Sequence, residues 1–129
     1  MCLNVTSKVP KRTKFVNGKA TAYKIFYKDD KTLISQYMGT VYKPGFNKAV
    51  GHPVFVDRLY GGAIHVCLSI RSAKTHASFE DCIVVPVTVY KKDFIAESET
   101  EAGFKQVFLS KANYLKALKA TKKYELVQK

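Results

Sequence analysis

Short segments in which apolar and polar residues alternate constrain the fold of this chain more than any other feature of its sequence. Residues 23 to 28, YKIFYK, alternate in this way and are expected to pair, through the turn sequence KDDK, with residues 33 to 42. Residues 63 to 70 alternate as well, and residues 82 to 90, CIVVPVTVY, are rich in β-branched residues. Pro86 lacks a backbone donor, which predicts a sheet edge or a bulge for that strand. The sequence therefore predicts a sheet-rich domain.

Two segments carry the signals of helices. Ser72 precedes small residues at helical spacing and is expected to cap a short helix over residues 72 to 80. Ser110 is expected to cap a longer C-terminal helix over residues 111 to 124. Its inward positions would be Ala112, Leu115 and Leu118. The fold class predicted is α+β, a single domain with a mostly antiparallel sheet, one short helix and one longer C-terminal helix.

The 129 residues are enough for one hydrophobic core. Residues 1 to 14 combine basic side chains and a proline without an apolar period, which predicts a flexible basic arm. A single globular domain is then expected over residues 15 to 129. Within it, residues 54 to 59 and 104 to 109 are predicted strands, and residues 93 to 103 an acidic loop.

A strong positive charge is the most informative functional feature. The 22 Lys and Arg residues outnumber the 10 Asp and Glu residues, which leaves a formal net charge of +12. Such an excess favours an anionic partner, although lysine-rich composition also serves simply to keep a small protein in solution. The excess is largest near the two ends of the chain, and both ends are therefore predicted to contact that partner.

Aromatic and basic residues adjoin in four places, YKIFYK, VYK, VYKK and KKYE. Lysines attract phosphates, and exposed rings can stack on unpaired bases. Lys outnumbers Arg, the residue that suits the reading of base edges, so we expect contacts mainly with the phosphates of DNA or RNA. The predicted nucleic-acid or anion-binding residues are Lys8, Lys11, Arg12, Lys14, Lys24, Lys28, Lys91, Lys92, Lys116, Lys119 and Lys123.

The strand in YGGAIHVCLSIR places four polar side chains on one side, namely His65, Cys67, Ser69 and Arg71. A strand with one solvent-exposed face explains this pattern without any function. The alternative is a small-ligand or phosphate site, with donors from Arg71 and a helix start and with His65 as a proton carrier. An enzyme or nucleotide-binding protein with its site near His65 and Arg71 is therefore a further hypothesis, less favoured than a role without catalysis.

Other chemistry finds little support in the sequence. Cys2, Cys67 and Cys82 form neither a disulfide framework nor a metal spacing, and we predict no metal and no cofactor. The acidic residues Asp93, Glu97, Glu99 and Glu101 look more like a solvated loop than a cation site. No segment has the length of a membrane span or the pattern of a signal peptide, so a cytoplasmic protein without membrane contact is expected.

The order of the YKIFYK hairpin, the Gly-Gly-x-Ile-His-Val strand, a short helix, VVPVTVYKKDFIA and GFKQVFLSK resembles small uncharacterised bacteriophage-encoded accessory proteins over residues 20 to 112. The resemblance implies a host-cell setting and binding in place of catalysis. The function expected is a small basic accessory protein that binds nucleic acid mainly through phosphates. The alternative partner is an acidic host protein, for example a defence protein or nucleic-acid enzyme, which the chain would inhibit by occlusion.

Overall fold

The computed structural model describes residues 3–29, 31–35, 40–55, 58–59, 61–77 and 82–127. Their nine-stranded sheet has the order β4-β9-β6-β1-β5-β8-β7, and every strand pair is antiparallel. The strands of this path are β1 (Lys19–Asp29), β4 (Gly45–Lys48), β5 (Ile64–Cys67), β6 (Cys82–Tyr90), β7 (Phe94–Glu97), β8 (Glu101–Phe104) and β9 (Gln106–Leu109). With two α-helices beside this sheet, the predicted α+β class is confirmed.

The predicted hairpin is present and is formed by the first two strands of the chain. β1 pairs with β2 (Thr32–Ser35), and Lys28 lies opposite Leu33. β3 (Val41–Tyr42) then pairs back onto β2, so the described parts of residues 33 to 42 form two strands where one was predicted. Residues 36 to 39 lie outside the described residues.

β6 runs through the middle of the sheet, between β9 and β1, so an edge position for the whole strand is wrong. The missing donor of Pro86 is nevertheless accommodated. Among the described residues β6 pairs with β9 only at Thr88, and the N–H of Val84 donates to the carbonyl of Lys123 at 2.9 Å instead of to a strand. Pro86 therefore lies where the side of β6 away from β1 has no strand ladder.

The short helix α1 (Ile70–His76) begins two residues earlier than predicted, and its cap is Ser69 and not Ser72. Ser69 Oγ accepts from the N–H of Ser72 at 3.1 Å, while Ser72 Oγ lies 3.4 Å from the N–H of Ser69. This reciprocal pair is a capping box. Ser72 occupies its third helical position.

The C-terminal helix α2 (Lys111–Lys119) is capped by Ser110 as predicted, with the N–H of Asn113 donating to Ser110 Oγ at 3.1 Å. The helix is shorter than predicted and ends at Lys119. Its buried residue is Ala117, whereas Leu115 is 45% exposed. The predicted inward face is therefore wrong for Ala112 and Leu115, which are both exposed, and correct for the partly buried Leu118.

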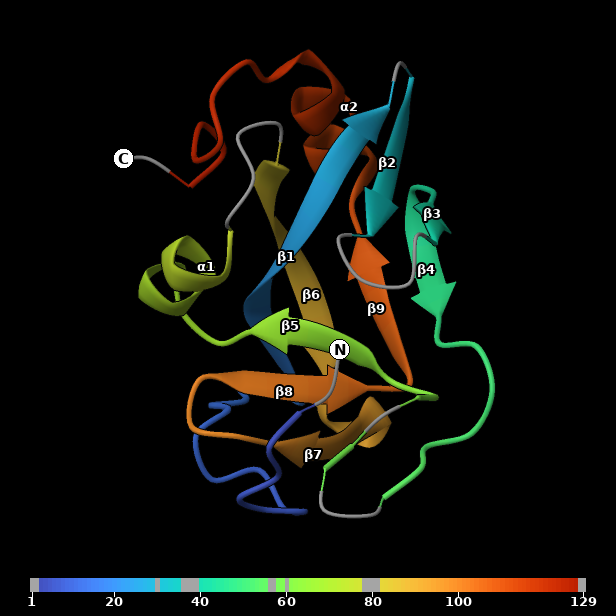
Figure 1. Cartoon of the computed structure of the whole chain (residues 1–129), viewed down its shortest axis with the longest axis vertical. Coiled ribbons are helices and arrows are strands. Elements are labelled where there is room, and N and C mark those ends of the chain that lie inside the picture. Colours follow the sequence, from blue (N-terminus) through green and yellow to red (C-terminus); the bar gives the residue numbers. More distant parts are fainter. Residues whose placement is uncertain are drawn as a thin grey trace.

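The sheet bends so that β5, β8 and β7 run across the direction of β1, β6 and β9 (Figure 1). The inner face of this bend holds the main core, which includes Phe26, Val85, Phe104, Leu109 and α2 residue Ala117. We call the opposite face of β1 and β6 the outer face. Figure 1 shows α1 at the left of the sheet and α2 at its upper end.

The described part of the predicted flexible arm is held against β7. Leu3 is buried and pairs with Leu59, and Ser7 pairs with Glu97. The Glu97 side chain, 0% exposed, accepts from the N–H groups of Lys11, Arg12 and Thr13 at 2.9, 2.6 and 3.1 Å, and from Thr13 Oγ1 at 2.9 Å. Residues 3 to 13 thus differ from the free arm that the sequence suggested.

Two other predictions need correction. The acidic segment is a β-hairpin of β7 and β8 that follows a 3₁₀ turn, η1 (Lys91–Asp93), and the predicted strand over residues 104 to 109 is divided between β8 and β9. Residues 54 to 59 do not form a strand in their described part. They show isolated bridges between Phe55 and Leu59 and between Leu59 and Leu3, and residues 56 and 57 lie outside the described residues.

Candidate functional site

The polar residues of the opening strand pattern do not share a surface. His65 is 9% exposed and Cys67 is buried, because β5 is covered on both sides, whereas Ser69 and Arg71 are exposed at the start of α1. A single solvent-exposed face is therefore wrong for His65 and Cys67. The candidate small-ligand site of these four residues has no common opening.

Burial also opposes the chemistry that this strand would need. Burial, with a smaller contribution from Lys24, lowers the pKa of His65 to about 4. Burial, and then the charge of Glu101, raise the pKa of the Cys67 thiol to about 12. At neutral pH the imidazole is uncharged and the thiol is protonated, so His65 is a weak base and Cys67 a poor nucleophile. These properties disfavour the enzyme hypothesis.

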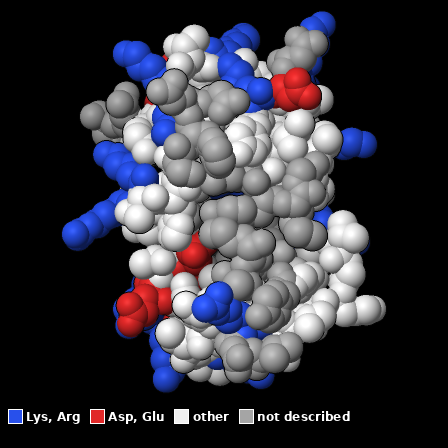
Figure 2. All heavy atoms as spheres, viewed as in Figure 1, with Lys and Arg blue, Asp and Glu red and all other residues white. Residues whose placement is uncertain are grey.

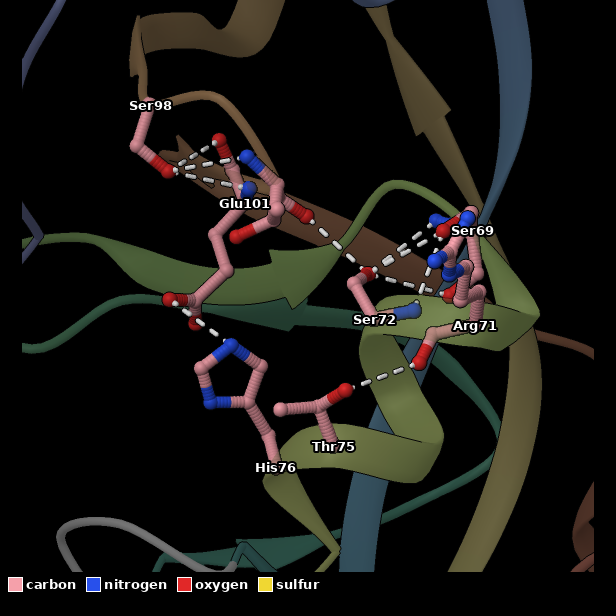
Figure 3. A network of polar contacts seen from close by, with 8 residues as sticks. Ser69, Arg71, Ser72, Thr75, His76, Ser98 and Glu101 are labelled. Carbon is pink, nitrogen blue, oxygen red and sulfur yellow. Dashed lines mark hydrogen bonds and ion pairs between the residues drawn. The ribbon is translucent and has the colours of Figure 1, made fainter.

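A hollow of about 530 Å³, lined by residues of polar type, lies nearby, between α1, the turn joining β7 to β8, and residues 4 to 6. Figure 3 shows the His76 ring of α1 facing the Glu101 carboxylate, and the distance from Nε2 to Oε1 is 3.6 Å. Ser72 Oγ donates to the carbonyl of Thr100 at 3.2 Å and so ties α1 to this turn. Burial raises the pKa of Glu101, while His76 and Lys24 oppose that change. The contacts around this hollow therefore join α1 to the turn between β7 and β8.

Several of the predicted anion-binding lysines are already engaged. Lys24 is 4% exposed, and its Nζ donates to the carbonyl of His65 at 2.9 Å. Lys28 Nζ donates to the carbonyl of Ala120, and Lys123 Nζ, which lies beyond the end of α2, donates to that of Ala77 at 2.9 Å. In these three lysines the ammonium group is occupied by the protein's own carbonyls.

The other predicted lysines lie in separate places. Lys8 stands over the Phe55 ring at 4.4 Å, and Lys14 donates to the carbonyl of Lys11 at 3.2 Å. Lys116 and Lys119 are exposed on α2, at the opposite end of the sheet from η1. Arg12, Lys91 and Lys92 are exposed as well. Figure 2 shows basic side chains along the top, both sides and the bottom of the molecule, with most acidic ones at its lower left. The two basic ends of the sequence do not form one patch in this view.

The outer face of β1 and β6 changes character along its length. At one end Ile25, Val84 and Cys82 are buried together with Ala73 of α1 and with Ala77, which caps the end of that helix. We call this the covered half. Towards the other end the register places Thr21 opposite Thr88 and Lys19 opposite Tyr90, and both β1 residues are exposed. Because α1 has only seven residues, it does not extend over this part of the two strands.

Three aromatic rings meet on the uncovered part of the sheet. β9 pairs Phe108 with Thr88 of β6, and β4 pairs Phe46 with Phe108, so these side chains lie on one face. The Phe46 ring lies 5.1 Å from that of Phe108 and 5.8 Å from that of Tyr90. Phe46 is 53% exposed, and the other two rings are partly exposed. We call Phe46, Tyr90 and Phe108 the aromatic face.

Lysines border these rings. Lys19 lies opposite Tyr90, and Lys48 follows Phe46 by two residues on the same side of β4. Backbone hydrogen bonds from Lys91 to Gly18 and from Ala49 to Lys105, at 2.9 and 2.8 Å, bring the segments that carry further lysines to this end of the sheet. We call the set the basic rim; it consists of Lys19, Lys48, Lys91, Lys92 and Lys105. All five are exposed, and none has a described carboxylate within 4.0 Å.

Local turns place two of these lysines. Asn17 and Gly18 have φ values of 55° and 76°, the pair of positive angles that a two-residue hairpin turn needs, and the chain then enters β1 at Lys19. At the start of β4, Gly45 has a φ of 102°, and the Asn47 side chain accepts from the N–H of Lys43 at 3.0 Å and donates to its carbonyl at 2.8 Å. These turns fix the positions from which the side chains of Lys19 and Lys48 project from the sheet.

Sequence reasoning identified only part of this site. It selected Lys91 and Lys92 beside Tyr90, but it missed Phe46, Phe108 and the remaining rim lysines. The sequence does contain a signal for this site. In GFNK and FKQVF an aromatic residue stands two positions from Lys or Gln, the spacing that places both side chains on one face of a strand. The strand order that joins these segments is not readable from them.

The described residues contain no group of three or more His, Cys, Asp or Glu side chains placed to hold a metal ion. Among them no helix has the length and apolar character required to cross a membrane. Comparisons of the chain with protein-family models, with curated proteins and with solved structures found no match.

Proposed function

We propose that this chain binds nucleic acid through the uncovered part of the outer face, with the lysines of the basic rim contacting phosphates. The observation that carries the proposal is the basic rim itself. Its five exposed ammonium groups border one sheet surface without a described carboxylate partner within 4.0 Å. Such groups release counterions when they meet a polyanion, which is the main source of affinity for a nucleic-acid backbone.

Charge and residue type both agree with this role. The net charge of +12 speeds the approach of any anion, and the rim contains lysines only. Lysine is a point charge and does not read base edges in the bidentate manner of arginine, so the contacts proposed are with the backbone. The chain would act as an accessory protein without catalysis, and the bacteriophage setting suggested by the sequence belongs to the same proposal.

The test is a titration of a labelled oligonucleotide, followed by fluorescence anisotropy between 50 and 300 mM salt. The double variant Lys19→Gln/Lys48→Gln should flatten the log–log salt dependence by about 1.4 on a single strand or about 1.8 on a duplex, since each lost phosphate contact changes the slope by about 0.7 or 0.9. The matched control is Lys116→Gln/Lys119→Gln, which removes the same charge from α2 and should leave the slope unchanged.

Two results would overturn the proposal. One is the absence of binding by the unmodified protein at the lowest salt concentration. The other is a flatter slope in the α2 variant with no change in the rim variant, which would move the contact to the last helix, where the sequence had also placed it.

A further inference from the structure

Nucleic acids differ in whether their bases are paired within a duplex or unpaired, and the aromatic face bears on which of the two this site suits. We infer that the ligand of this site is a single strand, whose unpaired bases stack on Phe46, Tyr90 and Phe108 while the basic rim holds its phosphates. This inference rests on the proposed function and adds the class of nucleic acid.

Exposure of the rings is the first argument. An exposed phenylalanine at 53% is unfavourable for a chain that has an inner core available, and Phe46 stands in contact with two other rings, not alone. Contiguous aromatic rings beside lysines are the arrangement by which proteins bind single strands without reading sequence. Every base offers a π face to such rings, so stacking tolerates different sequences.

The second argument is the shape of the site. In a duplex the base faces are buried within the stack, and a protein reaches only their edges from a groove. A helix or a two-stranded ribbon can enter that groove, whereas the aromatic face lies on neighbouring strands of a broad sheet. The face is therefore suited to bases that have left a duplex.

The third argument is the placement of charge on both sides of the rings. Lys19 stands on β1 and Lys48 on β4, with β6 and β9 between them. Three strand spacings of about 4.8 Å separate those two strands, or about 14 Å. A strand crossing the sheet would meet an ammonium group on either side of the rings, so that phosphates are held at both edges while the bases between them stack.

Affinities for twelve-nucleotide oligothymidylate, for oligouridylate of the same length and for a twelve-base-pair DNA duplex test the inference. The unmodified protein should bind a single strand more tightly than the duplex. Phe46→Ala should weaken single-strand binding by about 5- to 150-fold, the range found when one stacking ring is truncated, and leave duplex binding unchanged. The two single-strand arms show whether the strand is DNA, RNA or either.

Controls keep the outcomes distinct. Leu115→Ala removes an exposed apolar side chain from α2 and should leave all affinities unchanged, and unaltered thermal unfolding of Phe46→Ala excludes a folding defect. Equal affinity for duplex and single strand, together with no effect of Phe46→Ala, would overturn the inference but leave the proposed function standing. Binding to none of the three nucleic acids would overturn the proposed function as well.

Discussion

The two halves of the outer face are built from the same two strands, yet they differ in what lies on top. In the covered half, Ile25 and Val84 are paired in register and buried beneath α1. Four residues away along β6 is Thr88, paired with the exposed Thr21, and α1 does not reach this part of the two strands. The comparison teaches that one strand can contribute to a core and to a binding surface when the covering helix is shorter than the strand.

The edges of the sheet repeat this contrast. The free edge of the last strand, β7, is covered by the N-terminal segment, whose Thr6 and Ser7 N–H groups donate to the carbonyl of Glu97 at 2.9 and 3.2 Å. At the other end of the strand order, β4 pairs among the described strands with β9 alone, and it carries Phe46 and Lys48. Aromatic and basic side chains thus accompany the part of the sheet that other segments leave uncovered.

Truncating a side chain in each half should give the largest difference. Ile25→Ala removes buried methyl groups beneath α1 and should lower the free energy of unfolding by about 3 kcal/mol. Phe46→Ala removes a larger side chain that is 53% exposed and should cost less than about 1 kcal/mol. Urea denaturation of both variants measures the two costs. Equal losses would show that the aromatic face is part of the core and would break the comparison.

The buried carboxylate that holds the N-terminal segment should give the next effect. Burial raises the pKa of Glu97, but the N–H groups of Arg12, Lys11 and Thr13 outweigh it and lower the pKa below its ordinary value of 4.5. Glu97→Gln places an amide against these donors and should cost about 2–3 kcal/mol at pH 7.

The pH dependence follows from the same bonds. A carboxyl group whose pKa is lowered by folding stabilises the protein above its ordinary pKa, and this contribution is lost as the pH falls through the lower, folded-state value. The difference in stability between the unmodified protein and Glu97→Gln should therefore shrink below pH 4.5. A difference that stays constant under acid would contradict the role given to the carboxylate.

Two of the three lysines of β1, Lys24 and Lys19, extend the comparison to the inner face. Burial lowers the pKa of Lys24 to about 8, against the smaller opposite effects of Cys67 and Glu101. Between pH 8 and 10.5 the unfolded chain keeps a proton that the folded chain has lost, so this group makes the protein more stable as the pH rises. The advantage of Lys24→Met over the unmodified protein should shrink by about 3 kcal/mol across that window.

Lys19→Met is the matched control for this measurement. Lys19 is exposed on the same strand, so the stability of its variant relative to the unmodified protein should be flat with pH. Chemical denaturation at a series of pH values measures both differences. If the stability difference between Lys24→Met and the unmodified protein did not change with pH, the Lys24 amine would have to be hydrated in the folded state.

The smallest effect concerns the helix that makes the covered half. Ser69→Ala removes the cap of α1 and should lower stability by about 1 kcal/mol, because the N–H of Ser72 loses its acceptor. Binding of oligonucleotide at the uncovered half should be unchanged. Loss of binding in a variant that remains folded would show that the two halves are coupled.

The sequence predicted local structure more successfully than it predicted surroundings. Period-two alternation located β1, and β-branched composition located β6, because both signals act over a few residues. His65 and Cys67 were placed in solvent, since alternation shows which residues share a side of β5 but not that α1 and further strands cover that side. The burial of Lys24 was not predicted for the same reason, because a lysine within a strand normally indicates a solvent-exposed face.

The candidate site was still less predictable. Tyr90 and Phe46 are 44 positions apart in the numbering and meet only because β9 pairs with both β6 and β4. Such a register depends on long-range packing and on turns such as the one at Gly45. The contacts of the N-terminal segment were not predictable for a similar reason, because the N–H groups of Lys11, Arg12 and Thr13 donate to the carboxylate of Glu97, which is distant in the sequence.

A nuclear magnetic resonance titration tests the central claim most directly. Amide signals of the isotope-labelled protein are followed as oligothymidylate is added at low salt. The account predicts shifts in β4, β9, the end of β6 and the start of β1, with α1 and α2 unaffected. Signal shifts confined to either helix would contradict it. So would the absence of any shift when the oligothymidylate is in large molar excess over the protein.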